Sequence, residues 1–206
     1  MNRRSAEESR KKIISAALKV FSEYGYRGAC MRLIARQAGI SVGGVYLYFR
    51  NKEELFLTMM KEKMDELSGE LERAIDIDRP HDAIISYIKI HLEYTKRYKE
   101  LILTHIKDQG FSFGVDLKRK FAKEQRNLVQ AIVSNGITSG DFSPCNVEEI
   151  AKIIIGIIRG YVLSIIVDPE NLFSVEECNK FVMAGLKRNE NHHNHVLKVE
   201  RFTGNR

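Results

Sequence analysis

Residues 31–52 read M-R-L-I-A-R-Q-A-G-I-S-V-G-G-V-Y-L-Y-F-R-N-K. The apolar residues of the first half have the i, i+3, i+4, i+7 spacing of a helix with one buried face. They are Met31, Ile34, Ala35 and Ala38. Gly39 follows, where a left-handed residue ends a helix at low cost, and Ser41 offers a hydroxyl that can cap the next helix. The stretch predicts a helix-turn-helix over residues 31–50, whose second helix projects outward as insertion into a DNA major groove requires.

A longer stretch carries a family resemblance. Residues 34–55, I-A-R-Q-A-G-I-S-V-G-G-V-Y-L-Y-F-R-N-K-E-E-L, resemble the signature of the TetR (tetracycline-repressor) family of bacterial transcription regulators. The likeness extends over residues 7–57, whereas the rest of the chain matches the family only in length and helical character. It implies an all-α protein of about nine helices, with an N-terminal three-helix DNA-binding domain and a C-terminal helical domain that binds an effector and dimerises.

Capping pairs mark the starts of several helices and support the same fold class. Serine or asparagine followed three residues later by glutamate caps a helix reciprocally. Such pairs occur at Ser5 and Glu8, Asn51 and Glu54, Asn146 and Glu149, and Ser174 and Glu177. No segment alternates convincingly between apolar and polar residues, so the sequence predicts an all-α fold.

The expected boundaries follow from these pairs and from the turn residues between them. The first helix is expected to end at Gly25, and a later one to run from Asp116 to Asn135, with a loop over residues 136–144. We expect domains at residues 1–52 and 53–188. Residues 189–206 are polar and basic, which predicts a flexible tail.

The amino-acid composition limits the classes to which the protein can belong. The chain has 206 residues, 44% of them hydrophobic, enough to bury a core. Its cysteines, Cys30, Cys145 and Cys178, are odd in number and far apart, which favours a reduced cytoplasmic protein. The N-terminus is basic and polar, so no signal peptide is expected. The most apolar run, residues 153–167, is shorter than the roughly 20 residues of a membrane span, so no membrane association is expected.

Charge is divided unevenly along the chain. Residues 1–52 contain 11 Lys and Arg against 3 Asp and Glu, a net of +8, while residues 53–206 contain 22 against 24, a net of −2. Together they give the +6 of the whole chain. Positive charge therefore gathers in the segment that holds the helix-turn-helix, as phosphate binding requires.

The resemblance also implies which residues meet double-stranded DNA. The second helix of the motif is expected over Val42–Phe49, with Val45 and Phe49 inward. The implied DNA-binding residues are Arg32, Gln37, Ser41, Val42, Gly43, Gly44, Tyr46, Leu47, Tyr48 and Lys52. Within this set Gly43 lets the main chain approach the bases, Tyr46 packs on a base or phosphate, and Tyr48 and Lys52 contact phosphates. For Arg32 a surface salt bridge is the alternative.

Two departures from the family shape the expected recognition. Members often carry Lys, Thr and His where this chain has Val42, Gly44 and Leu47, so we expect specificity from thymine methyl groups, main-chain contacts and DNA shape. Ala29 stands where the family usually has a hydroxyl that caps the next helix, so that contact is expected to be absent unless Cys30 substitutes for it.

The apolar stripes of the last two helices predict a homodimer interface, because one helix-turn-helix buries too little to be selective. The expected interface residues are Ile150, Ile154, Ile157, Tyr161, Cys178, Phe181, Val182 and Gly185. The alternative is that these helices simply complete the core of one chain.

Family members usually release DNA when a small molecule binds the C-terminal half. Candidates for such a pocket are Tyr87, His91, Tyr94, His105, Phe121, Gln125 and Arg159. Singly, each also fits a core-edge residue with a satisfied hydrogen bond. Arg159 lies among isoleucines and, if buried, needs a partner, with an internal carboxylate favoured over a ligand acid. The effector classes considered are acyl-CoA-like and hydrophobic drug-like molecules, since residues 46–55 resemble members that sense fatty acyl-CoA.

Catalytic and metal sites are not indicated. His192, His193 and His195 cluster near the C-terminus without cysteine or acidic ligands at metal spacing, and no GxSxG, P-loop or HExxH motif occurs. We therefore expect no cofactor, no metal and no enzymatic activity. The hypothesis is a ligand-responsive repressor that binds a palindromic operator as a dimer. The alternative is a helical ligand-binding or enzymatic domain whose helix-turn-helix is incidental.

Overall fold

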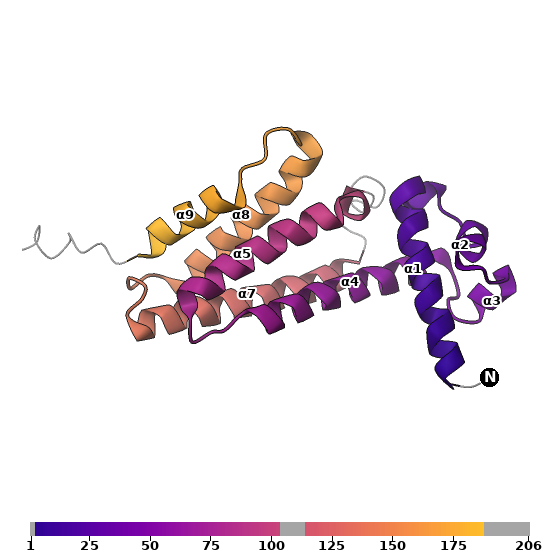
Figure 1. The fold of residues 1–206 in the computed structure, drawn as a ribbon, viewed down its shortest axis with the longest axis horizontal. Helices are drawn as coiled ribbons and strands as arrows, with labels where there is room; N and C mark the ends of the chain where they lie inside the picture. Colours follow the sequence, from indigo (N-terminus) through magenta and orange to yellow (C-terminus); the bar gives the residue numbers. More distant parts are fainter. Residues whose placement is uncertain (1–2, 104–113, 188–206) are drawn as a thin grey trace, which may run out of the picture.

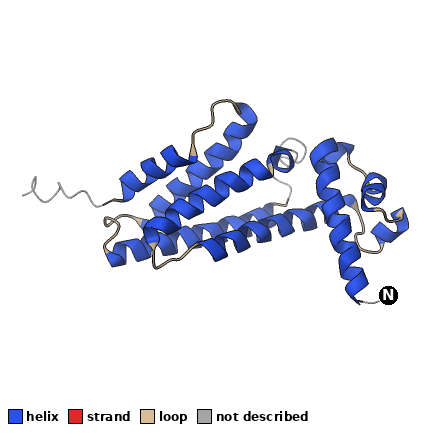
Figure 2. Cartoon of the chain, in the orientation of Figure 1, coloured by secondary structure: helices blue, strands red, loops and turns tan. Residues whose placement is uncertain are grey.

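A computed structural model describes residues 3–103 and 114–187 (Figure 1). Every named element in these ranges is an α-helix, and Phe142 and Lys187 form an isolated antiparallel bridge (Figure 2). The helices are α1 (Arg3–Gly28), α2 (Met31–Ala38), α3 (Val42–Tyr46), α4 (Lys52–Ala74), α5 (Pro80–Arg97), α7 (Val115–Ser139), α8 (Val147–Val167) and α9 (Val175–Leu186). The predicted all-α class is confirmed. The expected tail at 189–206 lies outside the described residues.

The N-terminal helices form one small core. Helix α1 contacts α2 and α4, and α2 contacts α3. Phe21 and Phe56 meet edge to face with ring centroids 4.9 Å apart, a geometry that aromatic pairs favour. Gly25, with φ 70°, interrupts α1 as its position in the sequence predicted. The predicted cap at Ser5 is wrong, because α1 already begins at Arg3 and the Ser9 hydroxyl bonds the Ser5 carbonyl inside the helix.

Helix α4 belongs to two cores, and Figure 1 shows it running from the N-terminal group along α7. Leu55, Phe56 and Met59 are buried with α1 to α3, whereas Leu67 and Leu71 are buried with the C-terminal helices. The division expected after residue 52 therefore falls at the start of a helix that both cores share. A displacement of α4 would therefore change the packing of both cores.

The C-terminal helices pack around α5, which contacts α4, α7, α8 and α9. Helix α7 continues to Ser139, past the predicted end at Asn135, and Gly140 ends it with φ 82°. Directly after the helix the chain turns back on itself: Phe142 folds over Gly136, and its N–H bonds the Gly136 carbonyl at 2.9 Å. Gly136, predicted to lie in a loop, is instead a helical residue against which the Phe142 ring packs.

Local capping chemistry sets the starts of three helices as predicted. The side chains of Asn51, Asn146 and Ser174 accept hydrogen bonds from the backbone N–H groups of Glu54, Glu149 and Glu177 at 2.8, 3.2 and 3.1 Å. No helix among the described residues is both long and apolar enough to cross a membrane.

Candidate DNA-binding face and ligand cavity

The turn between α2 and α3 has the geometry that its glycine and serine predict. Gly39 is left-handed, with φ 66° and ψ 32°, and its N–H bonds the end of α2. Ile40 N–H donates to the Ala35 carbonyl at 3.1 Å. The Ser41 hydroxyl then accepts from the Gly44 N–H at 3.0 Å, which caps α3. These bonds hold α3 at a fixed angle to α2.

Helix α3 is shorter than predicted, ending at Tyr46 rather than Phe49. Two adjacent glycines weaken the helix, and the chain must turn in time for Asn51 to cap α4. Val45 and Phe49 nevertheless point inward as expected, with 0% and 2% of their surface exposed. A Cβ added at Gly44 would lie 2.7 Å from a methyl carbon of Ile40, so a larger residue here would require the Ile40 side chain to shift.

Most of the residues predicted to meet DNA are exposed at the protein surface. Tyr46 is 50% exposed and Leu47 80%, which is unusual for side chains of this size. Exposed with them are Arg32, Gln37, Ser41, Val42 and Gly43. We call these exposed residues the α3 face. Cys30 precedes α2 but makes no side-chain cap bond, so it does not replace the missing hydroxyl at Ala29.

Tyr48 and Lys52 are more enclosed than the rest of the predicted set. The Tyr48 hydroxyl is buried and has no hydrogen-bond partner among the described residues. The Lys52 ammonium donates to the Tyr26 and Ala29 carbonyls at 2.7 and 2.9 Å and lies 4.4 Å from the centre of the Tyr26 ring. Two of its three N–H donors are thus used within the fold, and its phosphate contact stays a prediction.

A cavity of about 280 Å³ lies among α4, α5, α7 and α8. Its walls are mainly apolar, and Met60, Met64, Leu67, Ile155, Ile158 and Val162 contribute to them. The residues predicted for a pocket, His105 apart, are brought together around it: Tyr87, His91, Tyr94, Phe121, Gln125 and Arg159. His105 lies outside the described residues. Sequence periodicity missed the methionines, which look like ordinary core positions of α4.

The cavity has one buried polar corner. His91 and Gln125 are each only 6% exposed. Nδ1 of His91 lies 2.9 Å from the Tyr87 carbonyl oxygen. Burial lowers the pKa of His91 to about 4, so the ring is neutral near pH 7. Burial likewise raises the pKa of the Tyr87 phenol above its ordinary value.

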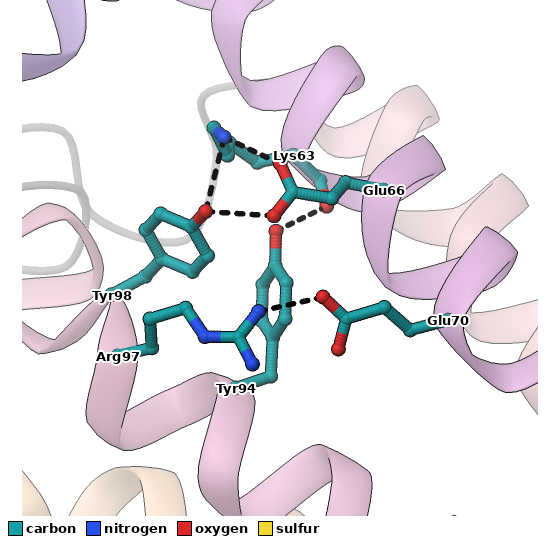
Figure 3. A network of polar contacts seen from close by, with 6 residues as sticks. All are labelled: Lys63, Glu66, Glu70, Tyr94, Arg97 and Tyr98. Carbon is teal, nitrogen blue, oxygen red and sulfur yellow. Dashed lines mark hydrogen bonds and ion pairs between the residues drawn. The ribbon is translucent and has the colours of Figure 1, made fainter.

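A polar network joins α4 to α5 beside this cavity (Figure 3). The Lys63 ammonium pairs with Glu66 and donates to the Tyr98 hydroxyl at 3.1 Å, and that hydroxyl donates to Glu66 at 2.7 Å. The Tyr94 hydroxyl donates to the Lys63 carbonyl at 2.6 Å. Lys63, Tyr94 and Tyr98 also line the cavity. The sequence did not reveal this network, because Lys63 and Glu66 look like an ordinary surface pair.

The sequence predicts a partner for Arg159 only if the residue is buried. The residue is exposed, and its guanidinium has no ion-pair or hydrogen-bond partner among the described residues. It borders the cavity with water available to its charge. The condition for an internal carboxylate partner, burial of the guanidinium, is therefore not met.

The predicted dimer residues divide into two groups. Ile154, Tyr161, Cys178 and Val182 are buried in the chain's own core, with exposures of 2%, 0%, 6% and 7%. Their assignment to the interface is revised for this reason. Phe181 is 73% exposed, Gly185 is exposed, and Ile150 and Ile157 are half-buried. Helix α8 is apolar on nearly every side, so periodicity alone did not reveal which side faces inward.

No group of three potential metal ligands occurs among residues 3–103 and 114–187. The histidine cluster at 192–195 lies outside those ranges.

Comparisons with known proteins identify the class to which these features belong. Residues 13–59 match the family described as "Bacterial regulatory proteins, tetR family". The chain is 32% identical to the transcriptional regulator RutR of Escherichia coli O157:H7, over 73% of this chain and 72% of that one. The chain belongs to the TetR family. It is also 30% identical to the fatty acid metabolism regulator protein of Bacillus subtilis, over 63% of this chain and 68% of that one.

A solved structure supports the fold of this TetR-family regulator. The FadR regulator of Bacillus subtilis, solved in complex with stearoyl-CoA, aligns with a TM-score of 0.68 and 24% identity, covering 85% of this chain and 98% of that one. The prediction of a helix-turn-helix transcriptional regulator is therefore confirmed. The alternative of an incidental helix-turn-helix is set aside, since the likeness to these regulators extends well beyond the motif.

Proposed function

We propose that this protein is a homodimeric repressor whose α3 faces read a palindromic operator and whose cavity binds a small molecule that releases DNA. The observation that carries the proposal is the pairing of an exposed, basic helix-turn-helix with an apolar cavity bordered by the same helix α4. The first supplies a DNA-binding surface. The second supplies a site whose occupation can displace α4.

The α3 face is suited to close contact with DNA. Beyond the neighbouring residues and backbone of its own helix, no atom of the described residues lies within 4 Å of where a Cβ on Gly43 would stand, so the main chain is open to the bases. Val42 and Leu47 offer apolar contact to thymine methyl groups. The net charge of +8 over residues 1–52 attracts phosphates. Few hydrogen-bonding side chains lie on this face, which leaves specificity to methyl contacts, the main chain and DNA shape.

An exposed stripe on α8 is the proposed dimer surface. Ile153, Leu163 and Val167 are 54%, 51% and 73% exposed. Gly156 and Gly160 lie between them along the helix, with no atom within 4 Å of an added Cβ. Small residues flanked by large apolar ones allow two helices to approach closely. Phe181 on α9 extends the apolar surface, and a self-complementary patch of this kind is typical of a twofold dimer.

The route from cavity to DNA-binding face runs through packed side chains. Helix α4 contributes four residues to the cavity wall: Met60, Lys63, Met64 and Leu67. Leu101 also lines the cavity and, at 2% exposure, belongs to the core that holds α1 to α3. A ligand that separates these residues changes the position of α4 relative to α1 and so the spacing of two α3 faces in a dimer. We propose this change as the means of release.

A gel-shift experiment on DNA from beside the protein's own gene tests operator binding. Tyr46→Ala should weaken specific binding at least tenfold, while Tyr24→Ala, which removes a similarly exposed tyrosine from α1, should leave it unchanged. Affinity should also fall steeply with salt. If the wild type and both variants bind every DNA equally weakly, the proposed operator function is wrong.

The dimer is tested separately by sedimentation equilibrium. Phe181→Arg places charge in the proposed interface and should yield folded monomers, because Phe181 is 73% exposed in the single chain. Ile77→Arg, at a 39% exposed apolar residue between α4 and α5, is the control and should leave the dimer intact. An intact dimer in the Phe181→Arg protein would assign the interface to another surface.

A further inference from the structure

The cavity has a size and lining that restrict its ligand, and this inference rests on the proposed effector function. At about 280 Å³ it has space for on the order of ten non-hydrogen atoms, since a water molecule takes roughly 30 Å³ in the liquid. Its apolar wall favours a hydrocarbon body over a polar one. The polar group of the ligand can be inferred from the hydrogen bond that is missing at the buried polar corner of the cavity.

Hydrogen bonding at that corner can be assigned atom by atom. The Tyr87 carbonyl can only accept, so Nδ1 of His91, 2.9 Å away, carries the proton. The ring is neutral, and its Nε2 is therefore a bare acceptor. The Gln125 side chain lies beside this ring.

This assignment leaves one group unsatisfied. The Gln125 side chain borders the cavity, and its Oε1 is buried and receives no hydrogen bond from the described residues. Native proteins pair nearly all buried polar atoms, because a carbonyl removed from water without a donor is destabilising. His91 cannot supply the donor, since its one N–H is already used. The missing partner is an N–H or O–H group brought by the ligand.

Charged ligands fit the site less well. The Lys63 ammonium is already paired with Glu66, whose carboxylate repels an anion. Arg159 is exposed, so an ion pair there is screened by water and weak. A ligand cation would find no free carboxylate among the described residues that line the cavity. We infer that the effector is an uncharged, mainly apolar molecule with a hydrogen-bond donor, such as a phenol or alcohol, that bonds Gln125 Oε1.

Matched probes of about nine to twelve non-hydrogen atoms test the inference with the full chain. They are 4-propylphenol, 4-propylanisole, propylbenzene and 4-propylbenzoate, of which only the phenol is an uncharged donor. Dissociation constants come from the concentration dependence of the thermal unfolding midpoint. We expect the wild type to bind the phenol at least tenfold more tightly than each of the other three.

Variants assign the preference to one atom. Gln125→Leu should bind propylbenzene as tightly as the phenol, whereas Gln130→Leu, on the same helix but away from the cavity, should keep the wild-type preference. The wild-type comparison of phenol with anisole decides the matter even if Gln125→Leu does not fold. The inference is overturned by equal affinities for these two probes, by binding of none, or by tightest binding of the benzoate with loss in Arg159→Met. These titrations contain no DNA, so a failure of operator binding is recorded independently.

Discussion

The N-terminal core and the C-terminal bundle are both helical, yet they use their interiors differently. Around α1 to α3 the interior is filled, with Phe21, Tyr26 and Phe56 in mutual ring contact. Around α5 the interior contains a cavity with an unpaired amide oxygen. A filled core holds the α3 face rigid for DNA. An unfilled one keeps a site open for a ligand at some cost in stability, and α4 connects the two.

Replacing a phenylalanine by alanine in each of the two regions should give the largest difference in the free energy of unfolding. Phe56→Ala should lower the free energy of unfolding by about 3–5 kcal/mol, because it opens a cavity in a filled core. Phe121→Ala should cost less than about 2 kcal/mol, since this half-buried side chain already borders empty space. Urea unfolding of both variants measures the difference, and equal losses would contradict the comparison.

The neutral histidine of the cavity predicts a pH dependence that the N-terminal core lacks. The pKa of His91 is about 4 in the folded chain and near 6.5 when unfolded, so below pH 6.5 protons bind the unfolded state preferentially. Stability from His91 is complete above pH 7 and is lost as the pH falls toward 4.

Denaturant unfolding at pH 7 and pH 4 measures this loss. The wild type should lose about 3 kcal/mol more than His91→Gln over that range. His81→Gln, at an exposed histidine that begins α5, should follow the wild type. Parallel pH profiles for the wild type and His91→Gln would show that His91 is not held neutral.

Alanine substitutions at two glycines should separate effects on packing from effects on DNA binding. Gly136→Ala places a Cβ 2.2 Å from a ring carbon of Phe142, and we expect a loss of about 1–3 kcal/mol in unfolding free energy with no direct effect on the α3 face. Calorimetry on the free protein measures it. An unchanged midpoint would mean that Phe142 moves aside without cost.

Gly43→Ala should change the free energy of unfolding least, and it should raise that free energy rather than lower it. Its Cβ meets nothing within 4 Å, so the helix should gain up to about 1 kcal/mol. Operator affinity should nevertheless fall about tenfold, roughly 1.4 kcal/mol, because the methyl group stands between main chain and bases. A gel shift beside a thermal melt checks both, and unchanged affinity would exclude close main-chain approach.

Local features were predictable, because each depends on neighbours in sequence. The left-handed Gly39, the Ser41 cap and the asparagine cap of α4 are decided within four residues. The inward positions of Val45 and Phe49 followed from the motif. The pocket residues on α5 and α7 were predicted as a group, since polar side chains beside apolar stripes stood out.

Features that depend on distant segments were not predictable. Phe142 packs over Gly136 near the end of α7 and is paired with Lys187 at the end of α9, which no local pattern signals. Helix α8 is apolar on several sides, so burial of Ile154 rather than Ile153 was decided by its contacts with α5 and α7. Arg159 lies among isoleucines in the sequence, and only the structure places it at an exposed position.

The amino-acid sequence by itself determined the helix-turn-helix, the basic charge around it and the helical class, because capping, turns and periodicity act over one or two helical turns. Only the tertiary structure decided where α4 is shared, which side of α8 stays exposed and which amide oxygen in the cavity lacks a donor. Those outcomes depend on how helices far apart in the chain fill the space between them, and a buried group's partners are known only once that space is filled.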